Sequence, residues 1–195
     1  MIFAIMGHTG SGKTTLANEL NEKFDVPVIT THTDRPMRDG EVDGVDYHFK
    51  EIGEITSDKY VCIREFWTVY RDEPFVYGLL KEDIEKFKHC IIVVDPRGYK
   101  SLVDMFPLVS GFVLDVPKET LKERLIARGD DINEFYRRYE SDSKDFEELD
   151  NLDKMKFSYD KIKTAISWFL LIEELEAEGF LKGHSTDVTG DIYGS

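Results

Sequence analysis

The stretch Gly7-His8-Thr9-Gly10-Ser11-Gly12-Lys13-Thr14 decides the fold of this chain. It matches the pattern G-x-x-x-x-G-K-[S/T], which is typical of loops that bind phosphate groups. An apolar run at residues 2–6 precedes it and has the length of a buried parallel strand. Leu16, Leu20 and Phe24 follow it at the spacing of one helix face, and a short strand is expected at 28–30. Strand, glycine loop and helix together predict a phosphate-binding loop in an α/β protein.

Each residue type in this loop has a chemical reason. Glycines adopt backbone angles that are closed to other residues, so successive N–H groups can point into one concavity at a helix N-terminus. Lys13 is expected to reach the outer phosphates of ATP, and Thr14 to place its hydroxyl on Mg²⁺. An ordinary glycine turn is the alternative, but the motif with these flanks is rare by chance. The predicted ATP-binding residues are Gly7, His8, Thr9, Gly10, Ser11, Gly12, Lys13, Thr14 and Thr15.

Length and composition predict one domain with a sizeable core. The chain has 195 residues, of which 41% are hydrophobic and 33% charged, and its net charge is −14. This acidity argues against non-specific binding to nucleic acid or to an anionic membrane. The two cysteines, Cys62 and Cys90, suggest neither a disulfide framework nor a zinc site. We expect no signal peptide and no transmembrane span, and hence a cytoplasmic protein.

From residue 31 to about residue 77 the chain is polar and aromatic, with little helical period. The β-prone runs at 60–63 and 68–70 suggest short antiparallel strands. A segment this long is more than a plain connection, so we interpret it as an inserted lobe that holds a substrate.

Within this lobe, residues 35–49 read R-x-x-R-x-G-E-x-x-G-x-D-Y-x-F, and this pattern after a phosphate-binding loop resembles guanylate kinase. The resemblance implies a lobe that holds GMP. It implies that Arg35, Arg38 and Tyr47 grip the GMP phosphate and that Thr31 touches the base. Two arginines three residues apart can form bidentate, charge-assisted bonds to one phosphate. The alternative is that they form surface ion pairs with nearby acidic residues.

The end of the lobe departs from the family. The resemblance implies that Glu65 reads guanine and that Tyr77 begins a turn on the substrate. Leu79 stands where the family has a hydroxyl residue, which puts strict guanine specificity in doubt. Trp67 and Tyr70 could stack on a base or could form the core of the lobe.

Residues 90–95 form an apolar run that ends in Asp95, which suggests a central strand with a carboxylate at its C-terminal end. The resemblance implies that Asp95 contacts the nucleotide substrate. It could instead bind the Mg²⁺ shell or cap the next helix, and the sequence does not choose between these roles.

A second strand at 111–116 leads into a helix that ends at Gly129. The R-L-x-x-R-G pattern at 124–129, where this helix ends, resembles the lid of monophosphate kinases, whose arginines offset charge on the transferred phosphoryl group. Arg137 and Arg138 point about 100° apart, so only one of them is expected to face the phosphates. A last strand at 155–159 and a helix from 160 to 178 complete the chain, and the five histidines show no ligand spacing. The predicted catalytic residues are Lys13, Arg128, Arg138, Arg124 and Arg137.

These features predict an α/β fold of the P-loop NTPase type, with three layers, a central parallel sheet, an inserted lobe and a helical lid. We expect one domain at 1–182, with core 1–30, 80–127 and 150–182, lobe 31–79, lid 128–149 and a tail at 183–195. The resemblance implies a monomeric or weakly dimeric kinase that uses ATP and Mg²⁺ to phosphorylate GMP or dGMP. A kinase for another monophosphate, a non-catalytic peptide-binding module and an ATPase or GTPase switch are the alternatives.

Overall fold

A computed structural model describes residues 1–66, 72–129 and 131–178 of the chain. It divides into two compact units. Unit one comprises residues 1–6 and 26–111, and unit two comprises residues 7–25 and 112–195. The predicted division into core, lobe and lid stays a prediction.

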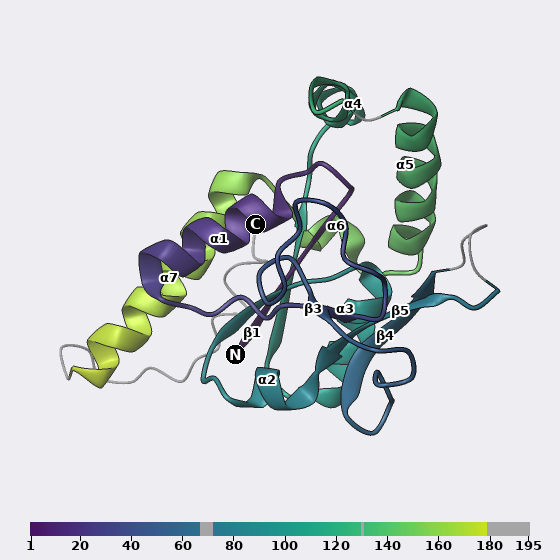
Figure 1. Ribbon diagram of the computed structural model, residues 1–195. Helices are drawn as coiled ribbons and strands as arrows, with labels where there is room; N and C mark the ends of the chain where they lie inside the picture. The colour runs from purple at the N-terminus through teal and green to yellow at the C-terminus, as the bar shows by residue number, and fades with distance from the viewer. Residues whose placement is uncertain (67–71, 130, 179–195) are drawn as a thin grey trace. The chain divides into compact units, whose positions relative to one another are not determined.

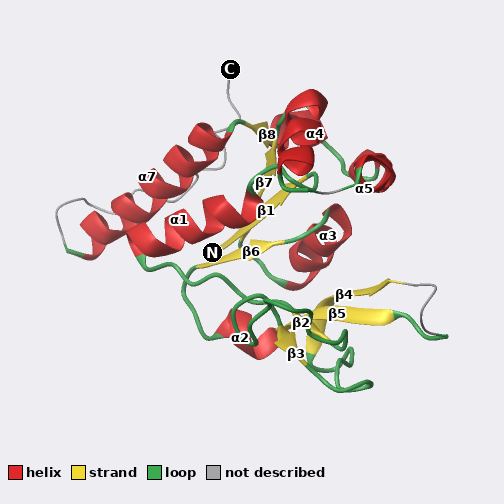
Figure 2. Cartoon of the chain, turned by 45° about the horizontal axis from the view of Figure 1, so that its top comes forward, coloured by secondary structure: helices red, strands yellow, loops and turns green. Residues whose placement is uncertain are grey.

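Unit one contains two groups of strands (Figure 2). Strands β1 (Ile2–Gly7) and β6 (Cys90–Val93) pair in parallel, with Ile2 opposite Cys90 and Ile5 opposite Val93. A mixed sheet has the order β3-β2-β5-β4, in which β2 and β3 are parallel and β5 is antiparallel to both its neighbours. Its strands are β2 (His32–Thr33), β3 (His48–Phe49), β4 (Tyr60–Phe66) and β5 (Phe75–Leu80).

The core of unit one forms where the mixed sheet, the parallel pair and two helices meet. The helices are α2 (Lys81–Glu85) and α3 (Pro96–Met105). Pro96 suits the first turn of α3, because a backbone N–H in the first turn of a helix has no partner within the helix and its absence in proline costs nothing. The core combines residues of β1, β4, β5 and β6 with Leu102 of α3, and every one of them is nearly excluded from solvent. Burial of such side chains contributes on the order of 2 kcal/mol each and holds the lobe to the parallel strands.

Unit two carries the remaining elements, and α1 (Lys13–Phe24) packs along α7 (Tyr159–Ala177), as Figure 1 shows. An ion pair between Lys163 and Glu19 joins these two helices. Strand β7 (Val109–Leu114), whose last three residues lie in this unit, pairs in parallel with β8 (Lys156–Phe157). Three further helices are α4 (Lys118–Ala127), α5 (Ile132–Glu147) and α6 (Leu152–Met155).

The predicted α/β fold with parallel strands and a separate lobe is confirmed, although some local predictions were wrong. The strand expected at 28–30 is a single bridge between Val28 and Ile91. Met155 ends α6 and does not begin the last strand, which is two residues long. The strand predicted at 68–70 and the tail predicted at 183–195 lie outside the described residues.

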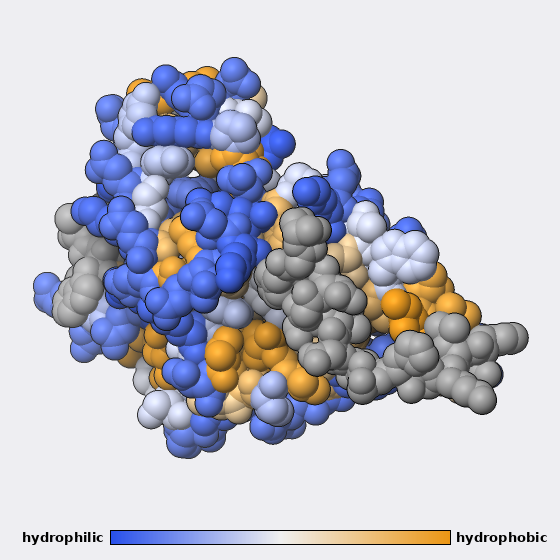
Figure 3. Space-filling model, turned by 180° about the vertical axis from the view of Figure 1, so that it is seen from behind, coloured by the Kyte–Doolittle hydropathy of each residue, from blue (hydrophilic) through white to orange (hydrophobic). Residues whose placement is uncertain are grey.

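Hydrophilic side chains cover much of the face drawn in Figure 3, with smaller hydrophobic groups between them. Over the described part of the chain, no helix has the length and apolar character needed to cross a membrane.

Candidate active site

The phosphate-binding loop runs between β1 and α1 in a conformation that depends on its glycines. Gly10 has φ +82° and Gly12 has φ +100°, a region that other residues rarely adopt. A Cβ atom added at Gly10 would lie 3.1 Å from Cγ of Leu125, because α4 packs directly against the loop. The glycine pattern therefore serves both the backbone angles and the close approach of a helix.

Lys13 and Thr14 lie in the first turn of α1. The Nζ atom of Lys13 donates to the carbonyl oxygens of Gly7 (2.8 Å) and His8 (3.0 Å). Burial lowers the pKa of Lys13, and the carboxylate of Asp142 opposes that shift. Thr14 is exposed, so its hydroxyl is accessible to a ligand. The lysine is thus folded over the same loop that is expected to hold the phosphates.

Helix α5 contacts the loop through side chains that the sequence did not single out. The backbone N–H and the hydroxyl of Thr9 donate to Oδ2 of Asp142, at 2.8 and 3.1 Å. Nε2 of His8 lies 3.1 Å from Oγ of Ser143, and its ring stacks on Tyr139 with centroids 4.6 Å apart. A carboxylate thereby binds a loop N–H of the kind that binds phosphate oxygens.

The four predicted lid arginines lie at different places on the two helices. Arg124, in the last turn of α4, donates from Nη1 to the carbonyl oxygen of Ser11 at 3.1 Å. Arg128 is the C-cap residue that follows α4, and its backbone N–H donates to the Arg124 carbonyl oxygen. On α5, Arg137 is exposed and Arg138 is half-buried. The structure therefore shows Arg124 in direct contact with the loop.

In the lobe, a hydrogen-bonded cluster forms around the buried Arg35. Its guanidinium donates to Oε1 of Glu41 (2.7 Å) and to the hydroxyl of Tyr77 (3.2 Å). Its Cζ atom lies 5.4 Å from the centre of the Tyr47 ring. The second oxygen of Glu41 accepts from the backbone N–H of Arg38 at 2.8 Å. The structure therefore brings Arg35, Tyr47 and Tyr77 together and leaves Arg38 on the surface of the lobe.

The two acids expected to read the base lie in different settings. Glu65 is exposed and pairs with Val76 on β5. Its neighbour Arg64, on the opposite face of β4, places Nη1 3.2 Å from Oδ2 of Asp95. The other oxygen of Asp95 accepts from the N–H of Gly98 at 2.7 Å and caps α3. The helix cap is thus present, and the base and metal roles of Asp95 stay predictions.

Leu79, which replaces a family hydroxyl, belongs to the core of unit one. It is 2% exposed and pairs with Val61 across β4 and β5. Thr31 is half-buried, and its carbonyl oxygen accepts from the N–H of His48 at 2.9 Å. Trp67 and Tyr70, for which the sequence left open stacking on a base or a place in the lobe core, lie outside the described residues.

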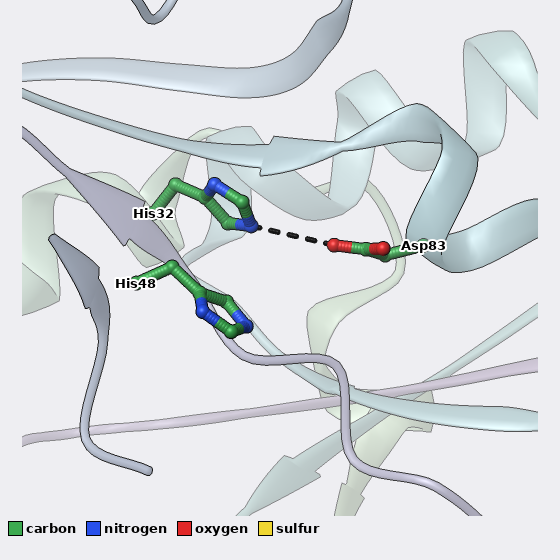
Figure 4. Close-up of side chains that lie close together, drawn as sticks. All are labelled: His32, His48 and Asp83. Atoms are coloured by element: carbon green, nitrogen blue, oxygen red, sulfur yellow. Dashed lines mark hydrogen bonds and ion pairs between the residues drawn. The ribbon is translucent and has the colours of Figure 1, made fainter. Parts of the chain in front are cut away.

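One group of side chains suited to a metal ion was missed by the sequence reasoning. It consists of His32, His48 and Asp83, which come from β2, β3 and α2 (Figure 4). Their separations along the chain match no ligand motif, so only the pairing of β2 with β3 and the placement of α2 reveal the group.

Comparison with known proteins finds one family. A protein-family model described as "Guanylate kinase" matches residues 2–167. A guanylate kinase from Helicobacter hepaticus is 32% identical over 135 residues, 67% of this chain and 68% of that protein. One from Chlamydia trachomatis serovar D is 35% identical over 133 residues, 65% of this chain and 64% of that protein. The alignments thus span about two thirds of the relatives' length.

A crystal structure of guanylate kinase from Anaplasma phagocytophilum has the same fold, with a TM-score of 0.62 at 19% identity. The alignment covers 89% of this chain and 85% of that chain. The fold and the glycine loop define an α/β protein of the P-loop class. Within that class, the match over most of the chain shows that it belongs to the guanylate kinase family.

Proposed function

We propose that the protein transfers the γ-phosphoryl group of ATP to GMP or dGMP, which gives ADP and the nucleoside diphosphate. The observation that carries the proposal is the cluster around Arg35 in a family member whose phosphate-binding loop is intact. A charged arginine fork beside two tyrosine rings suits a monophosphate dianion.

On the ATP side, loop N–H groups and the ammonium of Lys13 would hold the phosphates. Lys13 would first exchange its bonds to Gly7 and His8 for bonds to phosphate oxygens. The Mg²⁺ that accompanies ATP would offset negative charge on the phosphates. Thr14 fits this ion, because its exposed hydroxyl at the start of α1 is a hard oxygen donor.

On the acceptor side, Arg35 would orient the monophosphate, with the hydroxyls of Tyr47 and Tyr77 as neutral donors. Glu41 holds Arg35 in place before the substrate arrives. Catalysis would come from the alignment of the acceptor with the γ-phosphate and from arginine charge, with Arg124 the first of the lid arginines to test. No covalent intermediate is required.

A second acceptor class is favoured by a specific observation. Glu65, the expected guanine reader, is exposed, whereas Arg64 is the β4 residue that pairs with Asp95. A guanidinium donates hydrogen bonds, whereas the expected glutamate would accept them. Arg64 beside Asp95 therefore suits a base that has acceptor groups at its edge. Leu79 lies in the core of unit one and supplies no hydroxyl that could bond to a base. The alternative acceptor is therefore another deoxynucleoside monophosphate, including one with a modified base.

The other readings have less support. A peptide-binding module has no need for Lys13 and Thr14, and an ATPase or GTPase switch has no need for the cluster around Arg35. The net charge of −14 favours small nucleotide partners over nucleic acid. We propose a monomer or weak dimer that works in the cytoplasm.

The test is ADP formation from ATP and Mg²⁺ with a panel of acceptors: GMP, dGMP, AMP, dAMP, CMP, dCMP, UMP and dTMP. Turnover with GMP and dGMP supports the proposal. Preferred turnover with another base supports the second acceptor class. Absence of turnover with every acceptor, while the protein still binds ATP, would overturn both and favour the binding module.

A further inference from the structure

We propose that His32, His48 and Asp83 form a binding site for a divalent transition-metal ion of the Zn²⁺ type, separate from the Mg²⁺ that accompanies ATP. Each residue offers one ligand atom, and the three atoms lie within 4.8 Å of one another. All three residues belong to unit one. In Figure 4 the two imidazole rings lie one above the other, and the Asp83 carboxylate points at His32.

The distances are close to those of a formed site. Ligand atoms about 2.0–2.1 Å from a tetrahedral zinc ion are about 3.4 Å apart. Nε2 of His32 and Oδ2 of Asp83 are already 3.3 Å apart. His48 is therefore the ligand that would have to move when an ion binds. Its ring centre lies 4.5 Å from that of His32, and its side chain is half-buried. Two imidazoles and a carboxylate form a typical three-ligand set for Zn²⁺, with a fourth position left for water.

Outer partners orient two of the three ligands, as is usual in metal sites. The hydroxyl of the buried Tyr60 lies 3.0 Å from Nδ1 of His32, so Nε2 of that ring is the nitrogen turned to the site. Nζ of Lys86 donates to Oδ1 of Asp83 at 2.9 Å, which leaves Oδ2 toward His32. His32 itself is only 4% exposed, and a preset buried ring costs little further entropy when an ion binds.

The placement suggests what the ion would do. It would tie β2 and β3 to α2, and thus the start of the lobe to the helix that follows it. His32 follows Thr31, the residue expected to touch the base, so an ion here would hold that strand in position. The proposed metal would act on the order and stability of the lobe, and it does not depend on which monophosphate is the substrate.

The experiment is a titration of the untagged, chelator-stripped protein with Co²⁺ in the absence of nucleotide, followed by visible absorption. We expect one Co²⁺ per chain, displaced by Zn²⁺, and a higher midpoint of thermal unfolding with Zn²⁺. Loss of an outer partner costs about 10- to 100-fold in metal affinity, so Tyr60→Phe should weaken binding by about tenfold. His48→Gln and Asp83→Asn, which each remove a ligand, should weaken it by at least about 100-fold.

The matched control is His89→Gln, which removes a half-buried histidine from another part of unit one and should leave Co²⁺ binding unchanged. Thermal unfolding of each variant without metal shows whether it folds. A wild-type protein with no visible Co²⁺ band would overturn the proposal. Equal affinities in the wild type and in folded His48→Gln and Asp83→Asn would also overturn it, because the three side chains would then be a hydrogen-bonded group only.

Discussion

The phosphate-binding loop of unit two and the lobe of unit one reach their geometry in opposite ways. The loop is a run of consecutive residues whose backbone N–H groups are proposed to bind phosphate, so its shape depends on local backbone angles. The lobe assembles Arg35 with Tyr77, 42 residues away, and the pair depends on the sheet that brings them together. The proposed phosphate site therefore depends mainly on a local motif, whereas the proposed acceptor site depends on the pairing of residues far apart in the sequence. We therefore expect substitutions in the two regions to affect different kinetic constants.

The largest effect is expected at Lys13. Lys13→Ala removes the ammonium that would hold the outer phosphates, and loss of one such donor costs about 10²- to 10³-fold in kcat. We expect the upper end of this range in an ADP-formation assay, with binding of the monophosphate unchanged in calorimetry. Lys23→Ala, on an exposed position of the same helix, is the control. Equal loss of monophosphate binding would show that the two regions are not independent.

The next largest effect on kcat is expected at Arg124, and it distinguishes this residue from the other lid arginines. Arg124→Ala should lower kcat by about 10²-fold. The side chain already contacts the carbonyl oxygen of Ser11, so it can reach phosphates that the loop would bind. Arg137→Ala, at an exposed position on α5, should cost less. Single-turnover rates with saturating nucleotides measure both. A larger loss at Arg137 than at Arg124 would reverse the assignment.

In the lobe, Arg35→Lys should act on the acceptor and not on ATP. The change keeps the charge but removes the planar fork, and a hydrogen bond to a charged group contributes about 1.5–3 kcal/mol. We therefore expect KM for the monophosphate to rise by about 10- to 100-fold, with KM for ATP unchanged. The thermal midpoint should fall as well, because Glu41 loses a partner. Arg97→Lys, exposed on α3, should change neither constant, and a rise in KM for ATP alone would contradict the account.

The smallest effect is expected at Asp142. Its carboxylate binds the N–H and hydroxyl of Thr9, and it would compete with the phosphates of ATP for that N–H. Asp142→Asn should therefore tighten ATP binding by about fivefold, the equivalent of one ordinary hydrogen bond. Glu140→Gln, an exposed carboxylate on the same helix, is the control in the titration. Weaker ATP binding in Asp142→Asn would mean that this contact preorganises the loop.

Sequence reasoning reached the loop and the α/β fold because both depend on local patterns. It did not identify Arg64 as the partner of Asp95. Strand β4 changes register between Val61 and Arg64, where Cys62 has φ +54°. A shift of one residue exchanges the two faces of a strand, so alternation alone cannot show whether Arg64 or Glu65 faces α3.

The contact between Thr9 and Asp142 also could not be predicted from the sequence. It joins residues 133 positions apart, and only the packing of α5 against the loop creates it. The group of His32, His48 and Asp83 could not be predicted for the same reason, since the two histidines meet only after β2 and β3 pair. In each case a tertiary contact, and not a residue type, carries the information.

The most direct test of the central claim is phosphorus NMR of the protein mixed with ATP, Mg²⁺ and GMP. The account predicts that GDP appears as ATP is consumed, with one ADP for each GDP and little free phosphate. A mixture that yields ADP and inorganic phosphate, or one that leaves ATP and GMP intact, would contradict it.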